Sequence, residues 1–379
     1  MPNTSSTLIA VVLVLLSLGI VVLASTSSVK GDNTFGDPYY FLKKQAVWIV
    51  LALCAAAVAY RLDYHVWRRL SVGLMIGSTV LLCLVFVPGI GVHAGGSSRW
   101  IGLGPVTFQP SELARFSVVV LLSAWLAALG RRTENLREGL VLPLAAVGVV
   151  LILLMKEPDF GATFLTGTVA MVLLFAAGAR LSYLIVTGTL GACGFILAVL
   201  HDPIRMSRIF AFLAPHDPVY TDKAYQLIQS KNAFIAGGWF GVGLGESMQK
   251  QLYLPEPHTD SIFAIIGEEM GFPATILVLV LYMIFIVFGF RISFRAQDRF
   301  GKLLAFGLTM AIGMQAAINM GVVTGCLPTK GLPLPFISYG GSNLVMCLTA
   351  CGILLNIARQ CPGDAEAVPG PIKDRARRL

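Results

Sequence analysis

Charged residues are scarce in this sequence of 379 residues. Asp, Glu, Lys and Arg make up 13% of it, whereas about 25% is usual for soluble domains. Hydrophobic residues account for 56% of the chain, and the mean hydropathy is +0.77. This composition excludes an ordinary soluble protein. It predicts an all-α polytopic membrane protein.

The sequence also lacks a disulfide framework and a cysteine-based metal site. Most of its seven cysteines lie inside apolar runs, and no Cys-x-x-Cys pair occurs. There is no repeat of solenoid period and no low-complexity tract. The first apolar run has no basic residue before it and no clear small-residue cleavage site after it, so we expect a retained helix rather than a signal peptide.

Ten apolar runs are long enough to cross a bilayer as helices. They cover residues 7–25, 46–62, 70–88, 113–130, 139–155, 161–179, 183–200, 266–290, 302–325 and 343–358. Ten crossings place both termini on the same side. Lys and Arg are more than twice as frequent in the short segments on that side as in those on the other, which predicts cytoplasmic termini. The net charge of +8 therefore reflects membrane topology and does not indicate nucleic-acid binding.

The predicted organisation is one membrane domain over residues 1–361 and a short cytoplasmic basic tail over 362–379, near anionic lipid. The unusual segments all fall on the outer face; they are 89–112, 156–160, 201–260 and 326–342. The long outer loop at 201–260, between the seventh and eighth spans, contains an amphipathic stretch at 205–213 and a second helical candidate at 225–236. Because the cytoplasmic loops are short and plain, we expect the functional site at the outer leaflet.

The most polar stretch before the eighth span contains Glu256, His258 and Asp260. Asp260 lies where the loop enters the membrane, and lost solvation raises the pKa of a carboxylate toward the range of a general base. The alternative is a helix cap formed by Asp260 or Thr259. The spacing of the histidine and the acids is no recognised metal pattern. A Mg²⁺ or Mn²⁺ ion brought in with a phosphorylated substrate stays open.

Other outer segments add further charged candidates. Asp159 is either a helix cap or a second carboxylate of the site. Glu112 and Arg115, three residues apart, predict an intrahelical ion pair. Lys330 lies in a segment rich in proline and glycine, which predicts a re-entrant loop that lines a cavity. Five glycines between 237 and 245 predict tight turns and close packing rather than a nucleotide-binding loop.

At these positions the sequence resembles the SEDS family (shape, elongation, division and sporulation), to which bacterial FtsW and RodA belong. The matching motifs run along the whole membrane domain. They are Arg99-Trp-Ile, Gln109-Pro-Ser-Glu-Leu-Ala, Glu157-Pro-Asp-x-Gly, Tyr225-Gln-Leu-Ile-Gln-Ser, Gly-x-Gly-Leu-Gly-x-Ser-x-Gln-Lys250, Leu-Pro-Glu-x-His-Thr-Asp260, Gly-Glu-Glu269 and the segment from Leu327 to Ser342.

The resemblance implies a peptidoglycan glycosyltransferase that polymerises lipid II at the outer face of the bacterial cytoplasmic membrane. It implies that Asp260 is the catalytic residue. The residues that it implies for substrate binding are Arg99, Trp100, Glu112, Arg115, Asp159, Gln226, Ser230, Lys250, Glu256, His258, Lys330, Ser338 and Tyr339. The implied partners are a class B penicillin-binding protein, which is a transpeptidase, and other divisome proteins.

Some residues depart from the family pattern or leave alternatives open. Ser261 replaces a common phenylalanine, and Glu157 replaces a common glutamine. The Pro-Thr-Lys-Gly sequence around Lys330 resembles the division (FtsW) branch more than the elongation (RodA) branch. Besides an elongation-type polymerase, a lipid II flippase is the competing hypothesis, because Glu268 and Glu269 are polar groups at membrane depth. A transporter should have polar openings on both faces of the membrane, so the short and plain cytoplasmic loops argue against this alternative.

Overall fold

The computed structural model describes residues 4–94, 97–103, 106–215, 217–250, 254–255 and 257–361. The predicted basic tail at 362–379 lies outside these residues. The helices are α1 Thr4–Phe35, α2 Tyr40–Arg61, α3 His65–Leu84, α4 Pro110–Leu129, η1 Gly130–Glu134, η2 Arg137–Val141, α5 Leu142–Lys156, α6 Phe160–Ala176, α7 Leu181–Leu200, α8 Pro203–Leu213, α9 Thr221–Gly237, α10 Ile262–Arg295, α11 Arg299–Val323 and α12 Gly341–Arg359.

The helices confirm the predicted polytopic architecture. Within the described residues, nine helical segments are long and apolar enough to cross a membrane. The sixth predicted span corresponds to α6, an apolar helix in the shorter class. The main differences from the predicted spans lie at the ends of the helices. Helix α1 continues to Phe35 beyond its apolar part, and α10 begins at Ile262 rather than at 266.

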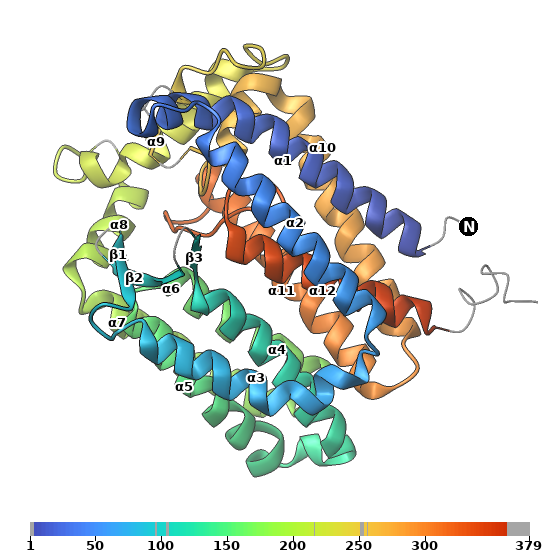
Figure 1. The fold of residues 1–379 in the computed structure, drawn as a ribbon. Coiled ribbons are helices and arrows are strands. Elements are labelled where there is room, and N and C mark those ends of the chain that lie inside the picture. Colours follow the sequence, from blue (N-terminus) through green and yellow to red (C-terminus); the bar gives the residue numbers. More distant parts are fainter. Residues whose placement is uncertain are drawn as a thin grey trace, which may run out of the picture.

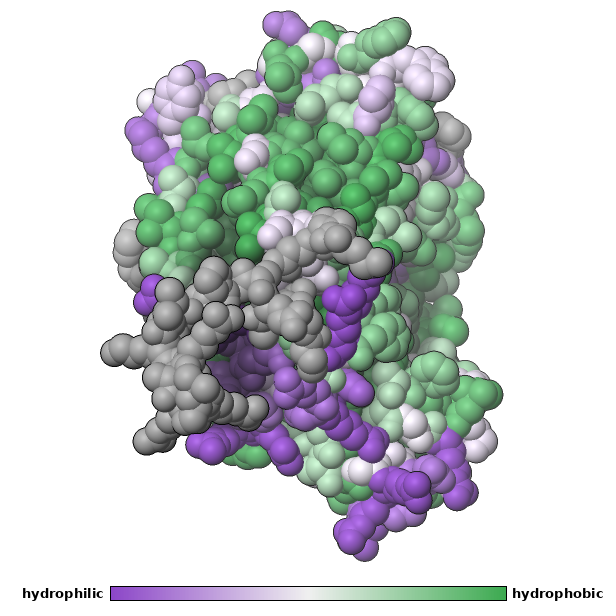
Figure 2. All heavy atoms as spheres, turned by 90° about the vertical axis from the view of Figure 1, so that its right-hand side faces the viewer, coloured by the Kyte–Doolittle hydropathy of each residue, from purple (hydrophilic) through white to green (hydrophobic). Residues whose placement is uncertain are grey.

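Helices α4, α11 and α12 form the centre of the bundle, where most of their residues are buried. In Figure 1, α11 and α12 lie between a group that contains α1, α2 and α10 and a group that contains α3, α4 and α5. Helix α7 lies at the periphery and has almost no buried residue. Figure 2 shows a broad hydrophobic area on one face of the molecule and hydrophilic side chains gathered below it, as expected for a surface in contact with lipid.

A small antiparallel sheet is an element that the all-α prediction missed. Strands β1 (Gly91–Ala94), β2 (Ser97–Leu103) and β3 (Val106–Phe108) pair in the order β1-β2-β3. Their shortness and the glycines between them conceal the alternating pattern of a strand. The sheet matters for the site because β2 carries Arg99 and Trp100.

The long loop confirms both helical predictions, with α8 over the amphipathic stretch and α9 over the second candidate. Its glycine-rich segment packs against a break in α10 at Gly271. Pro273 has no N–H to donate to the carbonyl of Glu269, and Gly243 N donates to that oxygen instead (3.0 Å). The loop thus completes the hydrogen bonds that the break leaves open.

One close contact of this segment is at Gly241, which has a φ of +76°. A Cβ at this position would lie 2.2 Å from the carbonyl oxygen of Glu269. The glycine-rich segment therefore serves close backbone packing, as predicted.

We expect Gly241→Ala to destabilise the protein by at least about 2 kcal/mol, because it adds a backbone clash to the strain of a positive φ. Gly238→Ala is the matched control, since Gly238 has a φ of +50° and nothing within 4 Å of the added Cβ. Thermal unfolding in detergent should show a clearly larger loss of melting temperature for Gly241→Ala. Equal losses would contradict the packing role.

Candidate active site

The largest of the described cavities that carries polar groups has a volume of about 600 Å³. It lies where the 201–260 loop, the sheet and the loop between α11 and α12 meet. Six of the predicted site residues line it, and these are Arg99, Trp100, Gln226, Asp260, Lys330 and Tyr339. The sequence prediction therefore brought together residues that are up to 240 positions apart in the chain.

Asp260 is held at the cavity wall by its backbone and by a close neighbour. The side-chain amide of Asn319 on α11 donates to the carbonyl oxygens of Asp260 (2.8 Å) and Leu332 (2.6 Å). A Cβ on Gly331 would lie 2.7 Å from Oδ2 of Asp260. One buried amide thus fixes the aspartate loop against the loop between α11 and α12. The carboxylate of Asp260 therefore packs directly against the backbone of Gly331.

Two further hydrogen bonds join the same loops. Ser338 Oγ donates to the carbonyl of Thr259 (2.5 Å), and Tyr339 N donates to the carbonyl of His258 (2.9 Å). The buried ring of His258 packs near Phe41 and Tyr339. His258 and Ser338 therefore orient the loop and do not line the cavity. Helix α10 begins at Ile262 and Ser261 occupies its N-cap position, so Asp260 lies one residue before the cap.

Two cations, Lys330 and Arg99, line the cavity. Lys330 Nζ lies 4.5 Å from the ring centroid of Phe164, and burial lowers the pKa of Lys330. Arg99 donates to the backbone carbonyls of Glu157 (3.2 Å) and Pro158 (2.6 Å). Both cations also line an adjoining cavity of about 150 Å³ between α6, α7 and α8. Paired cations of this kind suit the recognition of phosphate groups.

Several cavity residues were not predicted from the sequence. They include Arg208, Asp222, Lys223 and Tyr225. Arg208 belongs to the amphipathic stretch that became α8, and Tyr225 stands beside Gln226 in a quoted motif. The predicted residue Gln226 donates to Ser261 Oγ (3.1 Å), so the departure at position 261 provides a polar contact.

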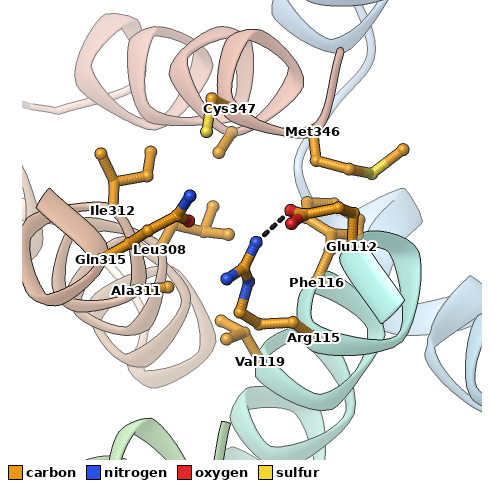
Figure 3. Close-up of a pocket in the computed structure, with 11 residues that line it drawn as sticks. Glu112, Arg115, Phe116, Val119, Leu308, Ala311, Ile312, Gln315, Met346 and Cys347 are labelled. Carbon is orange, nitrogen blue, oxygen red and sulfur yellow. Dashed lines mark hydrogen bonds and ion pairs between the residues drawn. The ribbon is translucent and has the colours of Figure 1, made fainter. Parts of the chain in front are cut away.

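Glu112 and Arg115 form the predicted ion pair, but in a separate cavity of about 30 Å³ between α4, α11 and α12. Figure 3 shows the guanidinium of Arg115 directed at the carboxylate of Glu112, with Gln315 facing them from α11. Asn343, which lines the large cavity, donates to Glu112 (2.9 Å). Gln315 donates to the carbonyl of Pro333 (2.7 Å). The pair thus supports the cavity from beneath and does not line it.

Two further predicted residues, Lys250 and Ser230, do not line the large cavity. Lys250 is buried and lies 3.6 Å from Glu269, which also accepts a hydrogen bond from Ser25 of α1 (2.5 Å). Ser230 is buried in α9. Glu256 lies outside the described residues. Glu268 accepts from Ser247 Oγ, so both acids of α10 pair with polar neighbours.

The donor atoms of the described chain do not form a complete metal site. Among the described residues, no group of three or more His, Cys, Asp or Glu side chains is close enough to hold an ion. Asp260 and Asp222 are carboxylates at the cavity wall. A divalent cation would need further ligands from a phosphorylated substrate.

The hinge between α5 and α6 contains a carboxyl group in an unusual setting. Asp159 accepts a hydrogen bond from Ala162 N (3.0 Å), which confirms the predicted cap. Glu157 is 0% exposed, and neither of its carboxyl oxygens has a hydrogen-bond partner among the described residues. Burial, followed by the charge of Asp159, raises the pKa of Glu157 to about 8, although Arg99 opposes the shift.

The fold and the cavity define a polytopic α-helical membrane protein with a polar site at one end of the bundle. The sequence pattern of the FtsW/RodA/SpoVE family, described as cell cycle proteins, matches residues 5–362. The chain therefore belongs to this family.

Relatives with assigned names are similar over nearly the whole chain. A probable peptidoglycan glycosyltransferase FtsW from Trichlorobacter lovleyi is 43% identical, with 93% of this chain and 92% of the relative covered. Stage V sporulation protein E of Bacillus subtilis is 40% identical, with 93% and 96% covered.

Two solved structures share the fold. One is a chain of a peptidoglycan synthase complex that coordinates polymerization and crosslinking. It matches with a TM-score of 0.76 at 29% identity, and 93% of this chain and 96% of that chain are covered. The other is the rod shape determining protein RodA of Thermus thermophilus. It matches with a TM-score of 0.69 at 26% identity, with 94% and 96% covered.

We expect the effect of Glu157→Gln on stability to grow as the pH rises from 4.5 to about 8. The folded protein keeps the Glu157 proton up to a pH of about 8, whereas the unfolded chain loses it near 4.5. Stability therefore falls as the pH rises through this window. The variant should melt at nearly the wild-type temperature at pH 5 and several degrees higher at pH 8 (about 2–4 °C per kcal/mol).

The exposed carboxylate of Glu246 provides the control for this measurement. Glu246→Gln should show no difference from the wild type that grows with pH. A melting-temperature difference for Glu157→Gln that is the same at pH 5 and pH 8 would show that Glu157 is ionised in the folded protein.

Proposed function

We propose that this protein is a peptidoglycan glycosyltransferase that polymerises lipid II into glycan strands. The observation that carries the proposal is the placement of Asp260, a fixed carboxylate in a cavity of about 600 Å³ that also presents Lys330 and Arg99. A carboxylate base and cations for a leaving pyrophosphate are the two chemical requirements of this reaction. The names of the relatives support the same activity.

In the proposed reaction, Asp260 takes the proton of the 4-hydroxyl of the GlcNAc in an acceptor lipid II. The oxygen attacks C1 of the MurNAc at the reducing end of the growing strand. The bond from C1 to undecaprenyl pyrophosphate breaks, and the configuration at C1 inverts. Negative charge develops on the leaving pyrophosphate. Lys330 and Arg99 stabilise this charge from fixed positions, since Arg99 is bonded to the α5–α6 hinge and Lys330 packs on Phe164.

The supporting residues act by holding this geometry. Asn319, Ser338 and Tyr339 fasten the Asp260 loop to the loop that carries Lys330. Asp260 and Lys330 are therefore held at a fixed distance from each other during the reaction. Catalysis by preorganised groups depends on such fixed positions. Trp100 and Gln226 line the cavity where the sugar units of lipid II would lie.

The proposed location is the bacterial cytoplasmic membrane, with the cavity at the outer face and both termini inside. The distribution of Lys and Arg supports this orientation. The proposed partners are a class B penicillin-binding protein and other divisome proteins, because a related solved structure is a complex for polymerization and crosslinking. Septal synthesis during division is the favoured process, since many of the similar relatives carry the name FtsW.

We expect Asp260→Asn to abolish polymerisation, with a loss of at least about 10³-fold, because it keeps the shape of the side chain and removes the base. The purified protein is assayed with labelled lipid II and its class B penicillin-binding protein, whose transpeptidase site is blocked. Glu246→Gln, an exposed carboxylate variant outside the cavity, should polymerise normally. Glycan strands formed by Asp260→Asn at the wild-type rate would refute the assignment.

We expect Lys330→Met to lower kcat by about 10²- to 10³-fold, with a smaller effect on KM, because the charge on the leaving group develops in the transition state. Lys330→Arg keeps the cation and should recover part of the rate. Lys43→Met, at an exposed lysine that pairs with Asp37, is the control. If Lys330→Met raised KM alone, Lys330 would serve binding and not the chemical step.

A further inference from the structure

An apolar groove of about 260 Å³ lies at the end of the bundle opposite to the proposed active site. It runs along α1, α2 and α12, and most of its lining side chains are apolar, such as Leu13, Leu53 and Leu355. Its rim residues Leu13 and Leu53 are 52% and 47% exposed. The groove therefore opens on the surface that faces lipid.

Small residues form the floor of this groove. Helices α2 and α12 pack so closely that a Cβ on Gly352 would lie 2.4 Å from the carbonyl oxygen of Ala56. Ala57 lies beside this contact and is exposed. Small residues let two membrane helices approach each other. In this protein the small residues also leave space for the groove, which the larger side chains of α1 and α12 border.

The length of the groove matches one leaflet. Each helix contributes a stretch of eight or nine positions, such as Leu53 to Tyr60 on α2. This corresponds to about 10–13 Å at a rise of 1.5 Å per residue, while half of the hydrocarbon core is about 15 Å thick. A helix with its side chains is about 10 Å across, and a groove of 260 Å³ is too small to hold one. The dimensions fit an acyl chain.

Two cations lie at the mouth of the groove. The guanidinium of Arg359 is 5.0 Å from the ring centroid of Tyr60, a lining residue. Arg61 is the last residue of α2 and stands four positions after the lining residue Ala57, on the same face of the helix. Neither arginine forms a salt bridge within the part of the chain that the structure describes.

Among the described residues, two acids close in sequence to the helices of this end already have partners. Asp63 lies 2.7 Å from His65, and Asp298 accepts a hydrogen bond from Tyr64. The two cations of the groove mouth are therefore available for an external anion.

We propose that this groove is a binding site for an anionic phospholipid of the cytoplasmic leaflet. One acyl chain fills the groove between α1, α2 and α12, and the phosphate group binds Arg61 and Arg359. Basic residues at the ends of membrane helices bind anionic headgroups in this manner. The face on which α1 begins is largely hydrophobic above and hydrophilic below, as such a lipid requires (Figure 2). The choice of leaflet rests on the orientation in the proposed function.

The test compares lipid retention in the purified full-length protein by native mass spectrometry, after addition of phosphatidylglycerol or phosphatidylcholine. We expect phosphatidylglycerol to be retained preferentially. Arg359→Gln and Arg61→Gln should each weaken retention about fivefold, because a cation near an anionic lipid contributes about 1 kcal/mol. Ala57→Phe fills the groove and should prevent retention of the lipid at this site.

Matched controls distinguish this site from general lipid contact. Val58→Phe adds the same side chain one position away, outside the groove, and Arg69→Gln removes an exposed cation from α3. Both should retain lipid like the wild type. Unchanged retention in Ala57→Phe and in the double variant Arg61→Gln/Arg359→Gln would overturn the proposal. So would loss of binding to the penicillin-binding protein in Ala57→Phe with lipid retention intact.

These measurements do not depend on catalysis. Lipid retention is measured without lipid II, so an inactive polymerase leaves the result interpretable. Conversely, a protein that polymerises lipid II but retains no phosphatidylglycerol would refute only the lipid site.

Discussion

The structure depends on satisfying the backbone of two irregular segments that enter a helical bundle. Carbonyl and N–H groups without partners are costly in an apolar surrounding. The Asp260 loop and the loop between α11 and α12 solve this problem jointly, because Asn319 bonds to both and Ser338 and Tyr339 bond across. The bonds that make these segments tolerable in a membrane protein are therefore the same bonds that define the proposed active site.

Charge in this bundle is arranged in two layers. The upper layer lines the large cavity, where Lys330 and Arg99 remain accessible. The lower layer is buried, where Arg115 pairs with Glu112 and the latter bonds to Asn343. A buried ion pair contributes little net stability but is costly to break. Its value here lies in the fixed position that it gives to the cavity floor, through Asn343 and through the bond from Gln315 to Pro333.

Much of this architecture could be predicted from the sequence, because long apolar runs and motif residues are strong signals. The spans, the helices of the long loop and six cavity residues were anticipated in this way. The sheet was missed because its strands are short and lie among glycines. Asn319 was missed because it stands inside an apolar run, although a lone amide at membrane depth is itself a functional signal. Lys250 was misplaced in the cavity because spacing in a loop does not reveal that its partner is the buried Glu269.

The contact between Gly331 and Asp260 has an evolutionary consequence. Any side chain at position 331 would occupy the space of the carboxylate, so mutation there cannot adjust the base without displacing it. Variation in substrate preference must then arise at the rim of the cavity, where Arg208, Asp222 and Lys223 have room to change. The residues at the centre of the cavity are therefore constrained in evolution, whereas those at its periphery can vary.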